Sequence, residues 1–79
     1  MQPGMAFLTL VDVELREARS KHTALNSAHE AYAVILEELD EFWEQVRLRR
    51  ERRDKQEMLK ELVQIAAMAA RTAEDIGLI

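Results

Sequence analysis

The residues that interrupt helices lie only at the two ends of this chain. Pro3 and Gly4 come at its beginning, Gly77 comes near its end, and no proline or glycine lies between them. The sequence also contains no internal repeat and no low-complexity tract. Because glycine and proline are the strongest local markers of turns and linkers, nothing indicates an internal domain boundary. We therefore interpret residues 1–79 as a single domain.

A chain of 79 residues is short for a self-sufficient hydrophobic core. A domain of this size buries only about 60% of the surface that its unfolded chain exposes. The sequence has no cysteine, which excludes both a disulfide framework and a thiolate metal site. We therefore expect homo-oligomerisation to stabilise the fold, and any metal to be held by oxygen or imidazole ligands.

The spacing of apolar residues predicts three helices. Residues 5–19 place most of their apolar side chains on one helical face, although the alternation from Thr9 to Leu15 is also compatible with a strand. Two longer stripes then follow the steps of three and four residues that characterise an amphipathic helix. The first stripe comprises Ala28, Ala31, Tyr32, Ile35, Leu39, Phe42, Trp43 and Val46. The second comprises Met58, Leu59, Leu62, Val63, Ile65, Ala66, Ala69, Ala70, Ala73 and Ile76.

Start and stop signals delimit the two longer helices. Ser27 and Glu30 have the spacing of a capping box, in which each side chain satisfies a free backbone N–H, and Asp54 and Glu57 repeat that spacing. Gly77 supplies the C-terminal stop. Since only a short charged segment separates the two helices, they must pack as an antiparallel pair. The predicted fold class is all-α: an antiparallel helical hairpin with a shorter N-terminal helix.

The third predicted helix has apolar residues over more than half of its circumference. Its alanines would let another helix approach closely: Ala66, Ala67, Ala69, Ala70 and Ala73. We interpret this face as a subunit interface, so that the second and third helices assemble a homo-oligomeric helical bundle, either a dimer or a tetramer. A plain coiled-coil module is disfavoured by the breaks at Asn26 and Asp54.

Charge and hydropathy restrict the partners. The longest apolar run, residues 65–70, is far too short to cross a bilayer, and the N-terminus lacks the pattern of a signal peptide, so we expect a cytoplasmic protein without membrane contact. The formal net charge of −4 is a poor balance for binding nucleic acid. It does not disfavour a small anionic ligand that carries a cation.

Acidic residues cluster in the second predicted helix. Glu37, Glu38 and Glu41 form the pattern E-E-x-x-E, in which Glu38 and Glu41 project from neighbouring turns. Glu61 and Gln64 repeat the i,i+3 spacing on the following helix. Hard oxygen ligands without imidazole or thiolate suit Mg²⁺, with Mn²⁺ as a second choice. The alternative interpretation is a solvated acidic face, which is common on helices.

These two motifs resemble those of the MazG-type nucleoside triphosphate pyrophosphohydrolases. In that all-α family, E-E-x-x-E on one helix is followed by E-x-x-D on the next, and the resemblance covers roughly two thirds of this chain. It implies that Glu38, Glu41, Glu61 and Gln64 are metal ligands, with Glu37 or Glu41 as the catalytic group that orients or deprotonates water. The implied reaction converts a nucleoside triphosphate to a monophosphate and pyrophosphate. Gln64 departs from the family, because its amide brings no charge where the family has aspartate.

Basic residues supply candidate contacts to the substrate phosphates. Arg47, Lys60 and Arg71 are the candidates, although Arg47 belongs to a run of arginines that also suits a solvated turn. Whether the chain is an enzyme stays open. The first hypothesis is a Mg²⁺-dependent pyrophosphohydrolase of nucleoside triphosphates. The alternative is a catalytically lapsed MazG-like helical protein that acts in nucleotide binding or protein assembly.

Overall fold

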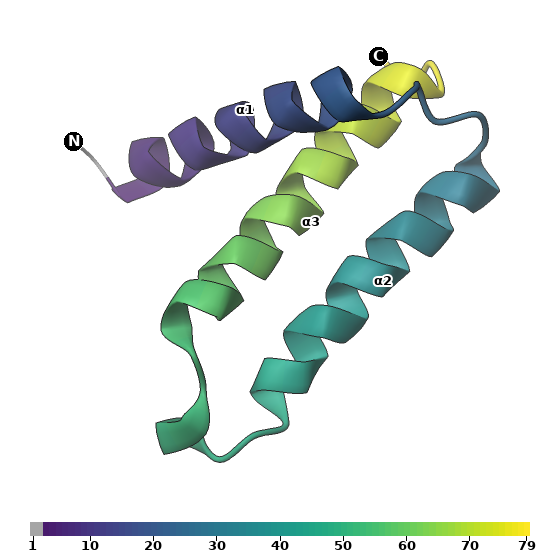
Figure 1. Cartoon of the computed structure of the whole chain (residues 1–79). Helices are drawn as coiled ribbons and strands as arrows, with labels where there is room; N and C mark the ends of the chain where they lie inside the picture. Colours follow the sequence, from purple (N-terminus) through teal and green to yellow (C-terminus); the bar gives the residue numbers. More distant parts are fainter. Residues whose placement is uncertain (1–2) are drawn as a thin grey trace.

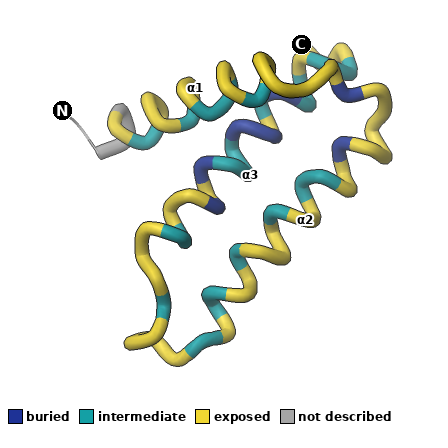
Figure 2. The backbone as a smooth tube through the Cα atoms, viewed as in Figure 1, coloured by how far each residue is buried: buried dark blue, intermediate teal, exposed yellow. Residues whose placement is uncertain are grey.

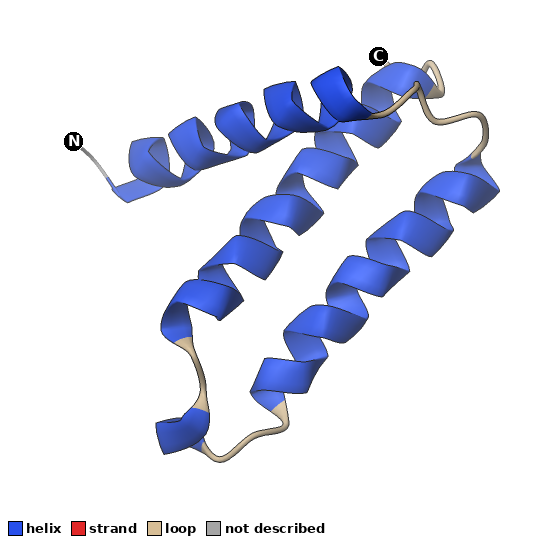
Figure 3. Cartoon of the chain, viewed as in Figure 1, coloured by secondary structure: helices blue, strands red, loops and turns tan. Residues whose placement is uncertain are grey.

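The computed structural model describes the backbone of residues 3–79 and the side chains of residues 6–79. All regular structure in this range is helical and no strand occurs in it (Figure 3). The helices are α1 (Pro3–Lys21), α2 (Ala28–Val46) and α3 (Lys55–Asp75), with a short 3₁₀ turn, η1 (Arg50–Arg52), between α2 and α3. The all-α prediction is confirmed, and the strand considered for the N-terminal segment is wrong. None of these helices has the length and apolarity needed to span a membrane.

The first helix is longer than the sequence suggested. α1 has 19 residues, as many as α2, so the expectation of a shorter N-terminal helix is wrong. It begins at Pro3, whose fixed φ and missing N–H suit the first helical position. Arg19 and Lys21 stand in its last turn, where positive charge interacts favourably with the helix dipole. These end effects extend the helix beyond the apolar pattern of residues 5–19.

α3 lies at the centre of the arrangement. α2 and α3 run antiparallel, as the short connection requires, and α1 crosses α3 near its C-terminal half (Figure 1). α3 therefore packs against both other helices, whereas α1 and α2 have little direct contact. The molecule measures 41 × 32 × 21 Å along its principal axes.

The start of α2 carries one half of the predicted capping box. Ser27 accepts a hydrogen bond from the backbone N–H of Glu30 at 3.1 Å. The carboxylate of Glu30 accepts from the side-chain amide of Asn26 at 3.3 Å. Ser27 is thus confirmed as the N-cap. The carboxylate of Glu30 holds Asn26, the residue before Ser27, in place.

The start of α3 is tied to the end of α2. Asp54 Oδ1 accepts from the backbone N–H groups of Gln56 and Glu57 at 2.9 and 3.1 Å, which confirms it as the N-cap. Its own N–H donates to Gln45 Oε1 at 2.9 Å. The predicted capping box assigned the bond from the N–H of Asp54 to the side chain of Glu57, but Gln45 of α2 accepts it instead. Arg53 strengthens this corner by donating to the carbonyl of Val46 at 2.6 Å, near the C-terminus of α2.

Gly77 ends α3 as predicted. Its φ of 75° lies in the left-handed region that glycine adopts without strain. The N–H of Gly77 donates to the carbonyl of Glu74 at 3.3 Å, and that of Leu78 donates to Ala73 at 2.9 Å. These two bonds form a Schellman motif, which satisfies carbonyls left free at the helix end.

The core is small. Its buried hydrophobic residues are Leu25, Ala31, Val63, Ala67 and Met68, and among the described residues no large side chain is fully buried. Leu25 comes from the segment between α1 and α2, and it packs with Ala31 and Met68. This segment is held down by Asp75, which accepts from the N–H of Leu25 at 2.9 Å and from Arg19 at 3.0 Å.

The apolar stripe predicted for α2 is only partly inside (Figure 2). Ala31 is buried and Ile35 half-buried, but Tyr32, Leu39 and Trp43 are 68%, 49% and 57% exposed. The reason is that the apolar arc of α2 is wider than the contact it makes with one neighbouring helix. α3 takes one edge of that arc and leaves the other edge free.

The alanine-rich face of α3 is largely occupied within the chain. Ala67 is buried, Ala66, Ala70 and Ala73 are half-buried, and only Ala69 of this set is exposed. Since α1 lies across α3 (Figure 1), this face is already covered in part by the chain itself. A subunit interface on the remainder of this face therefore stays a prediction.

Candidate metal centre

Three carboxylates from two helices meet between α2 and α3. Glu38 and Glu41 project from neighbouring turns of α2, and Glu61 reaches them from the second turn of α3. One carboxylate oxygen of each residue lies within 4.8 Å of the other two. The antiparallel pairing of the helices is what turns the two i,i+3 motifs toward each other. We call Glu38, Glu41 and Glu61 the carboxylate cluster.

The three members of the carboxylate cluster differ in exposure. Glu61 is 3% exposed, Glu38 is half-buried and Glu41 is exposed. A charged carboxylate in a buried position is unfavourable unless a positive charge or hydrogen bonds compensate it. The cluster is therefore closed on the side of Glu61 and open to solvent on the side of Glu41.

Burial and mutual repulsion change the protonation of the cluster. Burial raises the pKa of Glu61 to about 8, assisted by hydrogen bonds to Glu41 and Glu38 and by the negative charge of both. Burial also raises the pKa of Glu38, and a hydrogen bond from Glu61 partly opposes that effect. At neutral pH the cluster without a cation therefore keeps a proton, which Glu61 shares with its neighbours.

Gln64 adds a donor to this arrangement. Its amide matches its surroundings when the nitrogen faces the carboxylates, where it donates to Glu38 Oε2 at 2.6 Å and to Glu61 Oε2 at 3.3 Å. The predicted role, an amide oxygen that ligates a metal, requires the opposite orientation. Gln64 therefore stands in the predicted place, and in the orientation assigned from its hydrogen bonds it is a donor to the acids.

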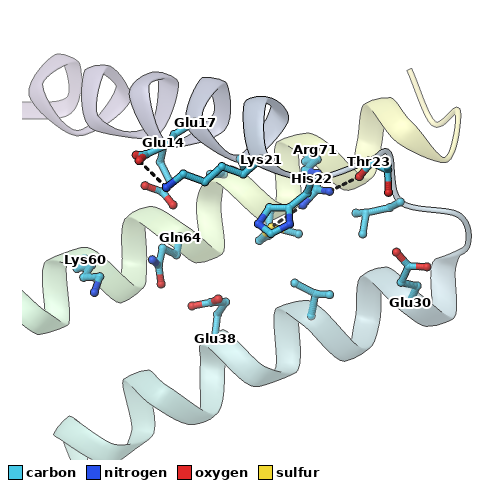
Figure 4. A pocket seen from close by; sticks show the side chains of 15 residues that line it. Glu14, Glu17, Lys21, His22, Thr23, Glu30, Glu38, Lys60, Gln64 and Arg71 are labelled. Atoms are coloured by element: carbon cyan, nitrogen blue, oxygen red, sulfur yellow. Dashed lines mark hydrogen bonds and ion pairs between the residues drawn. The ribbon is translucent and has the colours of Figure 1, made fainter.

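A groove opens beside Glu38 and Gln64 (Figure 4). It has a volume of about 790 Å³ and is lined by residues of all three helices. Glu38 points from α2 toward α3, and Gln64 points from α3 toward Glu38. A volume of this size suits a drug-sized or nucleotide-sized ligand. The carboxylate cluster thus shares one residue, Glu38, with a cavity large enough for a substrate.

The predicted phosphate contacts lie in different places. Lys60 lines the groove. Arg71 lines it too, but its guanidinium donates to the carbonyl of Thr23 and lies 3.6 Å from Asp75. Arg47 stands beyond the last residue of α2 and pairs with Glu44 at 3.0 Å. Lys60 is therefore the predicted cation best placed for a ligand in the groove.

Glu37 stands apart from the carboxylate cluster. It is exposed, and it contributes no ligand atom to the three oxygens that converge. Adjacent helical residues point about 100° apart, so Glu37 and Glu38 face different directions. Of the two candidate bases, Glu41 is the one whose carboxylate lies in the cluster.

Residues of α1 that the sequence analysis did not single out also line the groove. Glu14, Glu17 and Lys21 form one wall, with Lys21 paired to Glu17 at 2.9 Å (Figure 4). The negative charge of Glu14 contributes to the raised pKa of Glu38. The i,i+4 spacing of Glu17 and Lys21 indicated an ion pair on a helix surface. It carried no information that α1 would lie beside the acids.

The donor set fits a hard divalent cation. Three carboxylate oxygens match the ligands that Mg²⁺ and Mn²⁺ take in proteins, and the exposed side at Glu41 leaves room for water or phosphate oxygens. A cation would replace the shared proton and allow all three acids to ionise together. Gln64 could then turn its oxygen inward, because rotation of the amide exchanges its donor for an acceptor.

Comparison of this chain with protein-family models, with curated proteins and with solved structures finds no match.

Proposed function

We propose that this protein is a Mg²⁺-dependent hydrolase that converts nucleoside triphosphates to nucleoside monophosphates and pyrophosphate. The observation that carries the proposal is the convergence of Glu38, Glu41 and Glu61 from two helices beside a groove of about 790 Å³. The resemblance of the two acidic motifs to those of MazG-type enzymes suggests the substrate and the bond that is cleaved. The same proposal places the protein in the cytoplasm, where nucleotides and Mg²⁺ are available, as a homo-oligomer.

The protonation of the carboxylate cluster supports a cation as its ligand. Without a cation, a buried Glu61 holds a proton because two neighbouring carboxylates repel its ionised form. When bound, Mg²⁺ supplies the positive charge that neutralises the acids and the phosphate oxygens and lowers the pKa of a water molecule. Mn²⁺ meets the same requirement for oxygen ligands.

The residues of the groove and those of the carboxylate cluster have separable tasks. Lys60 offers an ammonium group to the phosphates, and the exposed carboxylate of Glu41 can accept a proton from the attacking water. The water oxygen forms a bond to the α-phosphorus while the bond to the bridging oxygen breaks. Pyrophosphate then leaves, and the proton from water stays on the carboxylate.

The test is pyrophosphate release from a panel of ribonucleoside and deoxyribonucleoside triphosphates with Mg²⁺ present. Glu38→Gln, Glu41→Gln and Glu61→Gln should each lower the rate by at least about a hundredfold, which is the usual effect of losing an acid–base group or a ligand. Glu37→Gln is the matched control, because it neutralises an adjacent but exposed acid of α2. Equal losses in all four variants would contradict the assigned roles.

A second candidate function is favoured by the orientation of Gln64. With its nitrogen toward the acids, the amide donates to Glu38 and Glu61, so this donor and the shared proton stand where a cation would otherwise be needed. This arrangement is expected of a catalytically lapsed MazG-like protein that binds a nucleotide or assembles with other proteins. Folded protein that binds Mg²⁺ or nucleotide but releases no pyrophosphate from any member of the panel would support this candidate against the first.

A further inference from the structure

One face of α2 carries four large apolar side chains that the described part of the chain leaves largely exposed. Tyr32, Leu36, Leu39 and Trp43 are 68%, 40%, 49% and 57% exposed. Their spacing of four, three and four residues places them in one line along the helix. We call these four residues the outer stripe.

The exposed area of the whole chain is too large for a monomer of its mass. The accessible surface is 6075 Å², whereas a folded monomer of 9.2 kDa exposes about 4,930 Å². The excess of about 1,100 Å² is close to the area of roughly 800 Å² that each partner buries in a stable interface of standard size. A homodimer with an interface of that size would therefore remove most of the excess.

The outer stripe is symmetric along the sequence. Tyr32 and Trp43 lie at equal distances from the midpoint between residues 37 and 38, and so do Leu36 and Leu39. Two antiparallel copies of one helix that pack about a twofold axis need this property, because positions equally far from the axis on either side meet each other. If two copies of α2 pack antiparallel about this midpoint, the two aromatic side chains face each other and the two leucines face each other.

We propose that a second copy of this chain covers the outer stripe through an antiparallel contact between the two α2 helices. Tyr32 then packs against Trp43 of the partner subunit, and Leu36 against Leu39 of the partner subunit. Aromatic side chains dominate such interfaces, because each buries a large area at little cost in side-chain entropy. The twofold axis passes between residues 37 and 38.

The proposed contact leaves the carboxylate cluster free. Around the helix Glu38 lies about 160° from Leu36 and about 100° from Leu39, so its side chain points to a different face from the outer stripe. Glu38 faces α3 and the groove (Figure 4), whereas each side chain of the outer stripe is at least 40% exposed. Assembly and metal binding are therefore separable, and each can be tested while the other is intact.

Sedimentation of the whole chain at about 100 μM tests the assembly, a concentration well above the micromolar range of a modest interface. One chain has a mass of 9.2 kDa, and we expect the measured mass to be twice that value. Leu36→Asp and Leu39→Asp should each weaken dimerisation at least tenfold while the helical circular dichroism is kept. Val13→Asp is the matched control, because Val13 is 57% exposed on α1 and should leave the dimer unchanged. A monomeric wild type, or an assembly insensitive to Leu36→Asp, would overturn the proposal.

Disulfide trapping tests the register, and the absence of natural cysteines makes the result unambiguous. A mixture of Tyr32→Cys chains and Trp43→Cys chains should cross-link in high yield under mild oxidation. Tyr32→Cys chains alone should not, because two copies of residue 32 would be about 16 Å apart along the helix axis. Cross-linking of Tyr32→Cys chains with one another would show a parallel contact and contradict the antiparallel register.

Discussion

Glu61 is the least exposed member of the carboxylate cluster, and its pKa of about 8 determines the charge of the cluster near neutral pH. Because metal ligands must be deprotonated, binding of a divalent cation at pH 7 should release a proton from this cluster. The metal affinity should therefore rise with pH up to about 8. This single side chain links cation binding, proton release and the stability of the fold.

The first prediction concerns the pH dependence of stability without metal. The folded pKa of Glu61 lies above its unfolded value of 4.5, so the native state binds more protons than the unfolded state between pH 4.5 and 8. The stabilisation that the protonated Glu61 contributes should therefore be complete below pH 4.5. The free energy of unfolding should fall as the pH rises from 4.5 to 8. We expect a loss of more than about 1.4 kcal/mol, the equivalent of one pKa unit.

Urea denaturation at pH 5.5 and pH 8.5 in the presence of a chelator measures this loss. Glu61→Gln should reduce the difference between the two pH values, because the amide keeps its shape and cannot ionise. Glu37→Gln should leave it in place, since Glu37 is exposed. A wild type whose unfolding free energy rises between these pH values would contradict the assigned state of Glu61.

The second prediction concerns Gln64→Asp. This change replaces a donor to Glu38 and Glu61 by a fourth acid, so it should lower the free energy of unfolding without metal by about 1–3 kcal/mol. With Mg²⁺ or Mn²⁺ the added charge should tighten binding by about tenfold or more, since ligand charge sets affinity for hard cations. Calorimetric titration with each cation measures the gain. An unchanged affinity would show that residue 64 does not reach the bound ion.

At the scale of residues, the sequence predicted which acids meet but not how they are satisfied. The i,i+3 spacing on two antiparallel helices was enough to bring Glu38, Glu41 and Glu61 together, because helical geometry is nearly invariant. The orientation of Gln64 could not be read from the sequence. It depends on which donor the acids lack once they are buried together, and that is a property of the folded environment.

At the scale of elements, Asp75 joins three segments of the chain. One oxygen accepts from the N–H of Leu25 and the other from Arg19, so the end of α3 is fastened to α1 and to the segment before α2. The backbone bond to Leu25 contributes most to a pKa of Asp75 that lies below its usual value of 3.8, and Arg19 lowers it further. The carboxylate is 5% exposed, which makes the loss of any partner costly.

The third prediction is that Asp75→Asn destabilises the fold more than Glu74→Gln does, because it removes the charge from an acceptor that is bonded to both Leu25 and Arg19. Glu74→Gln is the control: its side chain is 48% exposed in its pair with Arg19, and a surface ion pair contributes less than about 1 kcal/mol. Because the folded pKa of Asp75 is depressed, its contribution is present above pH 3.8 and should disappear as the pH falls below that value. Thermal denaturation at pH 3 and pH 6 measures both effects, and equal losses in the two variants would contradict the assignment.

Most features of the helices followed from local sequence, whereas their lateral contacts did not. Ser27, Asp54 and Gly77 marked helix ends correctly, because capping is a matter of a few neighbouring residues. The exposed position of Tyr32 and Trp43 was missed, since a wide apolar arc does not specify which of its edges a partner helix covers. The link from Gln45 to Asp54 was missed for the same reason, because it joins two elements.

At the scale of the whole molecule, the small core and the large exposed area both favour association between chains. Only five hydrophobic side chains are buried among the described residues, and the surface exceeds that of a monomer of this mass by about 1,100 Å². We expect a fold of this kind to gain stability from association. Its stability should therefore depend on how many copies of the chain are present.

The fourth prediction is that the melting temperature rises with protein concentration. Association stabilises the folded chain by mass action, so a hundredfold increase in concentration should raise the melting temperature by several degrees. Differential scanning calorimetry between about 5 and 500 μM measures this, in the concentration range where a micromolar dimer dissociates. Leu36→Asp should abolish the dependence. A melting temperature that is the same across this range in the wild type would show that folding and association are independent.

The position of α3 between the other two helices also orders events during folding. α1 has little contact with α2 and packs on α3, which follows it in the chain by more than thirty residues. While the chain is being synthesised, α1 therefore has no surface to dock on until the last of the three helices has left the ribosome. The α2 and α3 pair can form first, because its contacts are closer in sequence and close smaller loops. α1 is thus the first of the three helices to be made and the last to dock.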